Sequence, residues 1–447
     1  MSSKKVFIET HGCQMNVDDS IRMGRSLAPL SYEITQNPQE ADLILINTCS
    51  VREKASHKAR SSIGSYYEIK SQNPKVLLGL TGCQAQAEGK KLLQRFQYLD
   101  FVLGPDQMGS LPDKVKELEQ GRAHSINGTQ RIKPEDFSFV NLKLEAEESW
   151  NSAYVTIMKG CDNFCSFCIV PYVRGREVSR SSDEIISEIQ NLCSHGVKEV
   201  TLLGQNVNSY GTKNCGEISF TGLLYRIAGE TPVQRIRFMT SHPKDVGEDL
   251  AKAFGEIPAL AKHLHLPIQS GSNAVLKKMY RTYSREEYLK IIQSLRNACP
   301  ELAITTDFIV GFPGETDSDF EETLSLIKEV EFDGAYSFQY SPRPHTTAGR
   351  YFEDDVSRPL KEERLQKLQE CLTEMTLKKN EKCVGRIYEV LLEGFSKWGE
   401  TLQGRSTQNR IVHLNSTGNS EVGEMVQVKI LRATHNSLLG EIMGEMK

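Results

Sequence analysis

Short apolar runs alternate with polar, helix-compatible stretches in the first part of the chain. Three of these runs, at residues 6–8, 43–46 and 76–80, are each followed closely by a cysteine: Cys13, Cys49 and Cys83. Continuous apolar runs of this length are typical of buried strands, and their alternation with helices predicts a parallel sheet. Ligands of such sheets gather at the carboxyl ends of the strands, so we expect the three cysteines at one edge of one sheet.

A single buried cysteine usually serves as a small apolar side chain. Three at the same topological position, two of them preceded by Gly12 and Gly82, instead indicate a shared function. The apolar part of the N-terminus is too short for a secretory signal, and the chain has eleven cysteines, an odd number. A disulfide framework is therefore disfavoured, and we interpret Cys13, Cys49 and Cys83 as the ligands of an iron–sulfur cluster.

A second region of alternating strands and helices begins at residue 151, after a charged helix at 111–119 and a polar linker at 121–150. Strands are expected at 154–158, 200–203, 236–239, 264–266, 303–309 and 335–340. Six such units predict an open, partial (β/α)6 barrel rather than a closed barrel of eight. Polar and glycine-containing segments follow most of these strands, at the end where such barrels carry their functional residues.

The first strand of this region leads directly into three cysteines with the spacing C-x3-C-x2-C: Cys161, Cys165 and Cys168. Thiolates this close cannot pair off as disulfides, and they are one ligand short of a closed zinc site. They can hold three irons of a cubane cluster and leave the fourth iron open for a substrate or cofactor. The alternative is a zinc knuckle completed by His195 or Cys193, but the paired spacing that zinc motifs usually repeat does not follow.

The last part of the chain predicts a helix at 360–379 and then short strands at 388–393, 410–414 and 425–430. Strands separated by Gly, Ser and Asn turns in so small a segment predict a compact all-β barrel. Its candidates for phosphate contacts and base stacking are Arg405, Arg410, Lys429 and Trp398, although a solvated barrel surface explains the same charges. The predicted domains are therefore 1–120, a linker at 121–150, 151–378 and 379–447.

The composition agrees with several soluble domains. With 447 residues, 38% hydrophobic and 25% charged, the chain is too long for one ordinary core. No apolar run approaches the ~18 residues of a membrane span, so we expect a cytoplasmic protein. The net charge of −4 argues against a general polyanion binder, but a local basic patch can still bind nucleic acid.

The run from Lys159 to Pro171, continuing through residues 174–177 to Arg180, resembles the radical S-adenosylmethionine (SAM) methylthiotransferase family. The likeness covers nearly the whole chain. The N-terminal part resembles the family's own domain, whose three cysteines match Cys13, Cys49 and Cys83, and the C-terminal barrel resembles the TRAM RNA-binding module. Residues 203–208, 340–344 and the short loop around Arg405 are most similar to the bacterial branch that acts on tRNA.

The resemblance implies methylthiolation of C2 of N6-isopentenyladenosine at tRNA position 37. The implied cofactors are two 4Fe-4S clusters and SAM, with one SAM as the source of a 5′-deoxyadenosyl radical and another as methyl donor. An aromatic C–H bond offers no acidic proton and no leaving group, so a cofactor must supply the difficult step. The implied partners are a tRNA anticodon stem-loop carrying isopentenyladenosine, a flavodoxin-like or ferredoxin-like electron donor, and proteins that supply sulfur and clusters.

Position at the ends of the barrel strands, together with the family likeness, makes five residues candidates for SAM contacts. Gln205, Gln269 and Ser270 would provide polar contacts, and Gly311 with Phe312 the wall against the SAM adenine. The same chemistry on threonylcarbamoyl-adenosine in tRNA, or on an aspartate of a ribosomal protein, is an alternative. A non-catalytic RNA-binding iron–sulfur protein is disfavoured, because electron carriers normally complete their ligand sets.

Overall fold

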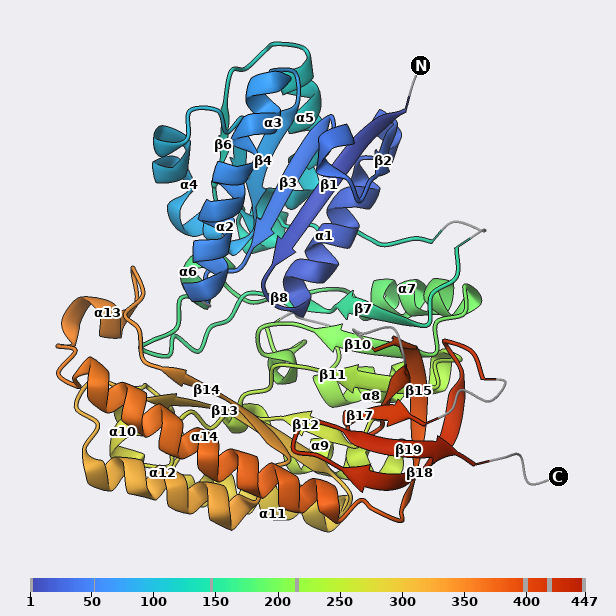
Figure 1. Cartoon of the computed structure of the whole chain (residues 1–447), viewed down its shortest axis with the longest axis vertical. Helices are drawn as coiled ribbons and strands as arrows, with labels where there is room; N and C mark the ends of the chain where they lie inside the picture. The colour runs from blue at the N-terminus through green and yellow to red at the C-terminus, as the bar shows by residue number, and fades with distance from the viewer. Residues whose placement is uncertain are drawn as a thin grey trace.

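The computed structural model describes residues 3–51, 53–144, 148–213, 217–396, 401–415 and 420–443. Three units follow one another along the chain (Figure 1): an N-terminal α/β layer, a central α/β half-barrel and a small β-barrel beside it. The expected α/β class, with a partial barrel in the middle and an all-β barrel at the C-terminus, is confirmed.

The N-terminal unit is built on a parallel sheet with the strand order β2-β1-β3-β4-β5-β6. The six residues of its central strand β3 are all buried, as expected for a parallel strand that is covered on both faces. The strands are β1 (Lys4–His11), β2 (Tyr32–Ile34), β3 (Leu43–Thr48), β4 (Leu77–Thr81), β5 (Phe101–Leu103) and β6 (Ile126–Gly128). The helices are α1 (Gln14–Ser26), α2 (Glu53–Ser65), α3 (Tyr67–Gln72), α4 (Cys83–Arg95) and α5 (Leu111–Glu119).

Strand β6 lies within residues 121–150, where the sequence predicts a linker. Ile126 and Gly128 pair with Phe101 and Leu103 of β5, so the first sheet continues past residue 120. A strand of three residues with an asparagine in the middle carries too little periodic signal to be recognised among polar neighbours. Strand β2 (Tyr32–Ile34) is equally short, and the sequence pattern does not reveal it either.

The central unit consists of two parallel three-stranded sheets that form one open barrel. One sheet has the order β11-β10-β7 and the other β12-β13-β14, and a bridge between Ile236 and Leu260 connects their edges. The strands are β7 (Ser152–Thr156), β10 (Glu199–Leu203), β11 (Arg235–Phe238), β12 (His263–His265), β13 (Ala303–Val310) and β14 (Gly334–Gln339). The outer helices are α7 (Ser182–Ser194), α8 (Phe220–Glu230), α9 (Glu248–Glu256), α11 (Arg285–Ala298), α12 (Asp317–Val330) and α14 (Arg358–Glu381).

The C-terminal unit is a closed barrel with the strand order β15-β16-β17-β19-β18. Strands β16 and β19 are additional to the expected ones, because each contains a glycine that gives the sequence a turn-like character. The strands are β15 (Ile387–Phe395), β16 (Leu402–Ser406), β17 (Ile411–Leu414), β18 (Met425–Ala433) and β19 (Leu438–Ile442).

Two buried arginines at the start of β11 attach this small barrel to the half-barrel. Arg237 donates to the carbonyl oxygens of Ser406 and Thr407 over 2.6 and 3.1 Å, and Arg235 donates to that of Arg405 over 3.1 Å. Both guanidinium groups also pair with Glu199, and Arg235 pairs with Glu389 as well, so two carboxylates balance the two cations. A covered hydrogen-bonded junction of this kind holds the two units in one orientation.

A buried ion-pair network joins the N-terminal unit to the half-barrel. Arg22 of α1 pairs with Asp18 over 2.8 Å and with Glu188 of α7 over 2.7 Å, and Arg180 also pairs with Glu188 over 2.7 Å. All four side chains are almost completely buried. Removing one partner of such a network leaves an unpaired buried charge, so the network strongly favours one arrangement of the two units. Among the described helices, none is both long and apolar enough to cross a membrane.

Candidate functional site

The structure brings Cys13, Cys49 and Cys83 together at one edge of the first sheet. They follow β1, β3 and β4, which are adjacent strands. A hydrogen bond from the thiol of Cys49 lowers the pKa of Cys13 to about 6, and the same bond raises the pKa of Cys49. Burial raises the pKa of Cys83. Binding of a metal cluster must therefore remove protons from at least two buried thiols.

Two glycines and two asparagines allow the three cysteines to approach one another. A Cβ on Gly12 would lie 2.8 Å from Cβ of Cys49, and Gly82 has a φ of +84° with Thr48 O only 2.8 Å from a built Cβ. Asn16 and Asn47, both fully buried, exchange hydrogen bonds behind the cysteines. The asparagines were not recognised in the sequence, although each stands close to a cysteine.

The second set, Cys161, Cys165 and Cys168, lies on the loop between β8 (Met158–Lys159) and the short helix α6 (Val170–Val173). Burial raises the pKa of Cys161 to about 11 and that of Cys168 to about 12, with further contributions from neighbouring thiols of the set. The N–H of Cys168 donates to the carbonyl of Cys165 over 2.9 Å, so these two cysteines lie on one tight turn of the loop.

Backbone contacts fix the shape of this loop. Gly160 has a φ of +78°, and its N–H donates to Oε1 of Gln205 over 2.5 Å. The N–H of Cys161 donates to the carbonyl of Gly175 over 3.1 Å, and that of Ser166 to the carbonyl of Met279 over 3.0 Å. The loop is therefore held from three sides of the half-barrel.

Both sets of cysteines fit an iron–sulfur cluster. The hydroxyls of Thr48 and Ser50, on either side of Cys49, are buried without a hydrogen-bond partner in the protein, as is Nε of Arg281 beside the other set. A bound group can satisfy these polar atoms. Within the described part of the chain, no His, Cys, Asp and Glu side chains are grouped as a single metal ion requires. An iron–sulfur cluster does not require the cysteines to converge on one point, because each cysteine binds a different iron.

The candidate SAM contacts occupy different environments. Gln205 supports the cluster loop through Gly160. Gln269 is buried with a φ of +78°, and its N–H donates to the carbonyl of Asp307 in β13 over 2.9 Å. The hydroxyl of Ser270 lies 3.4 Å from that of Thr323 and accepts a hydrogen bond from the N–H of Ser272. The hydroxyl of Ser270 therefore stabilises the turn at residues 270–272. Gly311, with a φ of +67°, leaves no room for a Cβ beside Lys361.

Phe312 is completely buried, with its ring 6.4 Å from that of Phe167 in the cluster loop and 5.0 Å from that of Tyr340. This position makes it a support behind the loop.

Asn208 and Ser241 have polar atoms that no other group in the protein satisfies. The amide of Asn208 and the hydroxyl of Ser241 are buried without hydrogen-bond partners, just after β10 and β11. They are further candidates for a polar cofactor, and only their position after the strands could have indicated them.

Aromatic side chains line one wall of the open barrel. Tyr336 and Phe338 of β14 are 56% and 39% exposed, and Ser337 between them points outward to Gln369 of α14. The ring of His265 meets that of Tyr336 at 6.1 Å between centroids. The two aromatic residues therefore face the lumen and present an exposed apolar surface there.

The candidate RNA contacts also differ in their environments. The guanidinium of Arg410 pairs with Asp333 over 2.5 Å and also donates to Asn380, so it joins the small barrel to the half-barrel. Arg405 is partly exposed, with Nε 3.3 Å from Glu393, and Lys429 is exposed. Trp398 lies outside the described residues.

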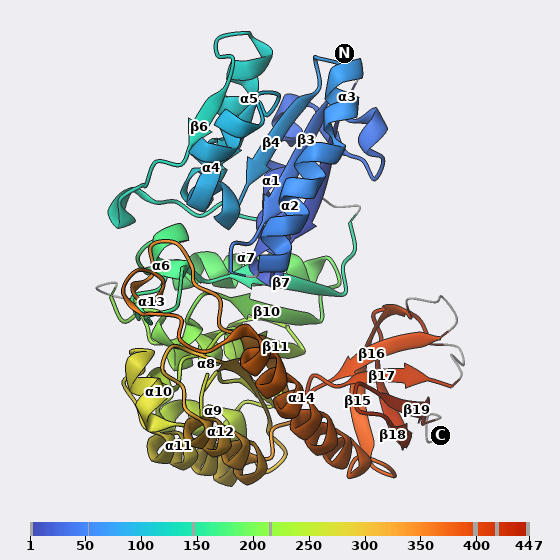
Figure 2. The ribbon, with the colours of Figure 1, turned by 60° about the vertical axis from the view of Figure 1, so that its left-hand side comes forward.

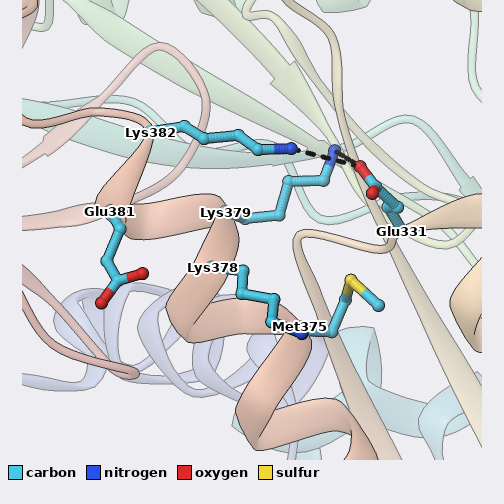
Figure 3. Close-up of a pocket in the computed structure, with 6 residues that line it drawn as sticks. All are labelled: Glu331, Met375, Lys378, Lys379, Glu381 and Lys382. Atoms are coloured by element: carbon cyan, nitrogen blue, oxygen red, sulfur yellow. Dashed lines mark ion pairs between the residues drawn. The ribbon is translucent and has the colours of Figure 1, made fainter.

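A cavity of about 380 Å³ lies away from the cysteines, at the end of α14 (Figure 3). Lys379 and Lys382 extend toward Glu331, with Nζ to Oε2 distances of 3.7 and 3.6 Å, while Glu381 points away. Glu331 stands just before β14, at the end of the barrel opposite the cysteines. The cavity is therefore separate from the candidate site.

Comparison with known proteins agrees with these features. Residues 5–104 match the uncharacterized protein family UPF0004, residues 155–327 the radical SAM superfamily and residues 381–443 the TRAM domain. A Geobacter metallireducens protein named tRNA-2-methylthio-N(6)-dimethylallyladenosine synthase is 48% identical over 445 residues, covering 98% of each chain. Proteins of the same name from Myxococcus xanthus and Clostridium botulinum are 44% and 43% identical, covering 99% and 97% of this chain and 95% and 96% of their own.

The chain belongs to the tRNA-2-methylthio-N(6)-dimethylallyladenosine synthase family. Among solved structures, the radical SAM methyltransferase TsrM from Kitasatospora setae matches with a TM-score of 0.60 and 13% identity, over 87% of this chain and 81% of that one. At this identity the match supports the fold alone. Within the synthase family, the N-terminal unit, the half-barrel and the small barrel correspond to the three matched regions in order.

Proposed function

We propose that this protein methylthiolates C2 of N6-isopentenyladenosine at position 37 of tRNA. The observation that carries the proposal is that a cysteine of the first set packs against the segment that directly follows the second set. Cys83 packs against Ile169, the residue after Cys168, and against Val173. Two neighbouring sites, each with an incomplete set of ligands, suit a reaction in which one site activates the substrate and the other provides sulfur.

Cys161, Cys165 and Cys168 would hold the SAM-binding 4Fe-4S cluster, and Cys13, Cys49 and Cys83 the second. When bound, these groups supply a radical that can remove the hydrogen from adenine C2 and a sulfur that can take its place. The protein's own part is to orient them. Gln205 holds the cluster loop through Gly160 N, and Asn16 holds the Cys13 N–H through its Oδ1 over 3.3 Å. Asn208, Ser241 and Gln269 offer polar contacts for SAM.

The target base would enter through the open side of the half-barrel. Tyr336 and Phe338 provide apolar, aromatic surface on the lumen side of β14, which suits an adenine and its isopentenyl group. Recognition of an unstacked loop base by aromatic side chains is usual for RNA-binding proteins. The partly exposed Arg405 and the exposed Lys429 would contact the RNA backbone from the small barrel.

The proposal includes partners that this reaction needs. A flavodoxin-like or ferredoxin-like protein would supply the electrons, other proteins would supply sulfur and clusters, and a tRNA substrate places the reaction in the cytoplasm. Each is inferred from the chemistry and the family likeness.

The decisive test uses the anaerobically reconstituted protein with isopentenylated and unmodified tRNA. We expect about eight irons per chain and methylthiolation of the isopentenylated tRNA alone. Replacing Cys13 with Ala should remove about four irons and abolish methylthiolation while leaving reductive SAM cleavage intact. Cys371→Ala, at a partly buried cysteine of α14 that belongs to neither set, is the matched control and should retain both activities. Turnover only on threonylcarbamoyl-adenosine tRNA or on a ribosomal protein would contradict the substrate assignment.

A further inference from the structure

The side chain of Arg174 crosses from the half-barrel into the N-terminal unit. Its Nε donates to Sγ of Cys83 over 3.2 Å, and its Nη2 donates to Oδ2 of Asp19 over 2.6 Å. The residue is buried. Figure 2 shows α6, which Arg174 follows, beneath α4, the helix that begins at Cys83.

The backbone next to Arg174 holds a cysteine of the other set. The carbonyl of Gly175 accepts the N–H of Cys161 over 3.1 Å, and a Cβ on Gly160 would lie 1.9 Å from the carbonyl oxygen of Arg176. One short segment therefore contacts both sets, by its backbone on one side and by the Arg174 side chain on the other. Residues 174–176 therefore join the two sets through a single stretch of backbone.

We propose that Arg174 is a positioning residue that sets the geometry between the two cluster sites and raises the reduction potential of the N-terminal cluster. The inference rests on the proposed role of Cys13, Cys49 and Cys83 as cluster ligands. A cationic N–H donor at a ligand sulfur stabilises the reduced, more negative state of a cluster, and hydrogen bonds to sulfur are among the factors that set its potential. The planar guanidinium reaches Cys83 and Asp19 at once, which a lysine ammonium does not do with the same geometry.

Arg22 offers a matched comparison. It also joins the N-terminal unit to the half-barrel, and it is buried to the same degree. Its hydrogen bonds go to Asp18, Glu188 and the carbonyl of Val140, none of which belongs to a cysteine. Loss of Arg22 should loosen the junction between the units without changing the electronic environment of Cys83.

The experiment uses the full-length chain with Cys161, Cys165 and Cys168 replaced by Ala, so that only the N-terminal cluster is loaded. Its midpoint potential is measured by a redox titration followed by electron paramagnetic resonance. Arg174→Met should shift the reduction equilibrium at least tenfold toward the oxidised state, which is about 59 mV for a one-electron step. Arg174→Lys should give a smaller shift in the same direction, and Arg22→Met should give none.

Each outcome decides between the possibilities. If the chain with Cys161, Cys165 and Cys168 replaced by Ala, the parent in this experiment, binds no iron, the proposed cluster ligands are contradicted. If the cluster is present but its potential is unchanged in Arg174→Met, only the inference about Arg174 is overturned. An equal shift in Arg22→Met would show that loosening of the junction, rather than the bond to Cys83, sets the potential. If Arg174→Met does not fold, Arg174→Lys and Asp19→Asn provide the decision, and unchanged potentials in both would overturn the inference.

Hydrogen exchange of α4 and α6 supplies a second readout for the geometric role. Exchange should be at least tenfold faster in Arg174→Met than in the parent, because the bond that joins these helices is lost. Unchanged protection would show that Arg174 does not fix the separation of the two sites.

Discussion

Lys159 Nζ lies 2.7 Å from Oδ1 of Asp106 and 3.4 Å from the centroid of the Phe137 ring. Lys159 stands two residues before Cys161, whereas Asp106 belongs to the N-terminal unit, so this pair connects the two halves of the site. Both side chains are almost completely buried. Burial lowers the pKa of Lys159, against the opposing effect of Asp106.

Replacing Lys159 with Met should lower the free energy of unfolding by about 3–5 kcal/mol, because the buried Asp106 carboxylate loses its main partner. Arg131 Nη1, 3.5 Å from Asp106, compensates only in part. Chemical denaturation under anaerobic conditions measures the change. The double variant Lys159→Met/Asp106→Leu should recover most of the loss, since apolar replacement of a buried pair is often neutral. A single variant as stable as the parent would show that the pair is energetically unimportant.

Replacing Gly160 with Ala should remove the SAM-binding cluster and leave the second one. The new Cβ would lie 1.9 Å from a backbone oxygen, and the φ of +78° is unfavourable for alanine, so the loop before Cys161 must move. Iron should fall from about eight to about four per chain. Gly64→Ala is the control, because nothing lies within 4 Å of its Cβ, and it should keep all the iron. Full iron content in Gly160→Ala would contradict the tight geometry.

Replacing Tyr336 with Ala should raise KM for isopentenylated tRNA. Stacking of a base on an aromatic ring is worth about 1–3 kcal/mol, which corresponds to about a 5- to 150-fold change. Steady-state kinetics measure it, with SAM cleavage in the absence of tRNA expected to stay unchanged. Tyr225→Ala removes an exposed tyrosine from the outer helix α8 and should leave KM as it is. Equal effects of the two changes would argue against a base-binding wall on β14.

Acid should destabilise the protein through His242. Burial, with smaller contributions from Arg281 and Lys244, lowers the pKa of this histidine to about 2. Below about pH 6.5 this histidine binds a proton in the unfolded chain but not in the folded protein. Its protonation therefore costs no stability above that pH, and the free energy of unfolding decreases as the pH falls from about 6.5 toward 2. The slope attributable to His242 is about 1.4 kcal/mol per pH unit in this window.

The variant His242→Asn should flatten this slope, because asparagine does not titrate and can still accept the N–H of Lys244 as His242 does. Urea denaturation at a series of pH values measures the effect, with the exposed His435→Asn as control. The same slope in His242→Asn and in the parent would show that His242 is not the responsible group.

The sequence pattern reveals the parts of the site that follow strands. Cys13, Cys49 and Cys83 each stand after an apolar run, so their meeting at one sheet edge follows from topology alone. The bond between Arg174 and Cys83 depends on how two units pack, and no local period contains that information. Asn16 and Asn47 look like ordinary polar residues, because only the fold shows that they are buried side by side. Arg410 shows the converse: a charge that suggests RNA is neutralised by Asp333.

Because of the junction at Arg235 and Arg237, the small barrel can help to select the nucleotide that reacts, in addition to binding RNA. Bonds from β11 to the backbone at residues 405–407 leave it no freedom to swing on a tether. On the proposed function, the distance between the small barrel and the two cluster sites is then fixed. An RNA stem bound to the barrel can bring only the nucleotide at that distance to the clusters. A neighbouring adenosine with the same chemical group would fall short or overshoot, so selection is made by length as well as by chemistry.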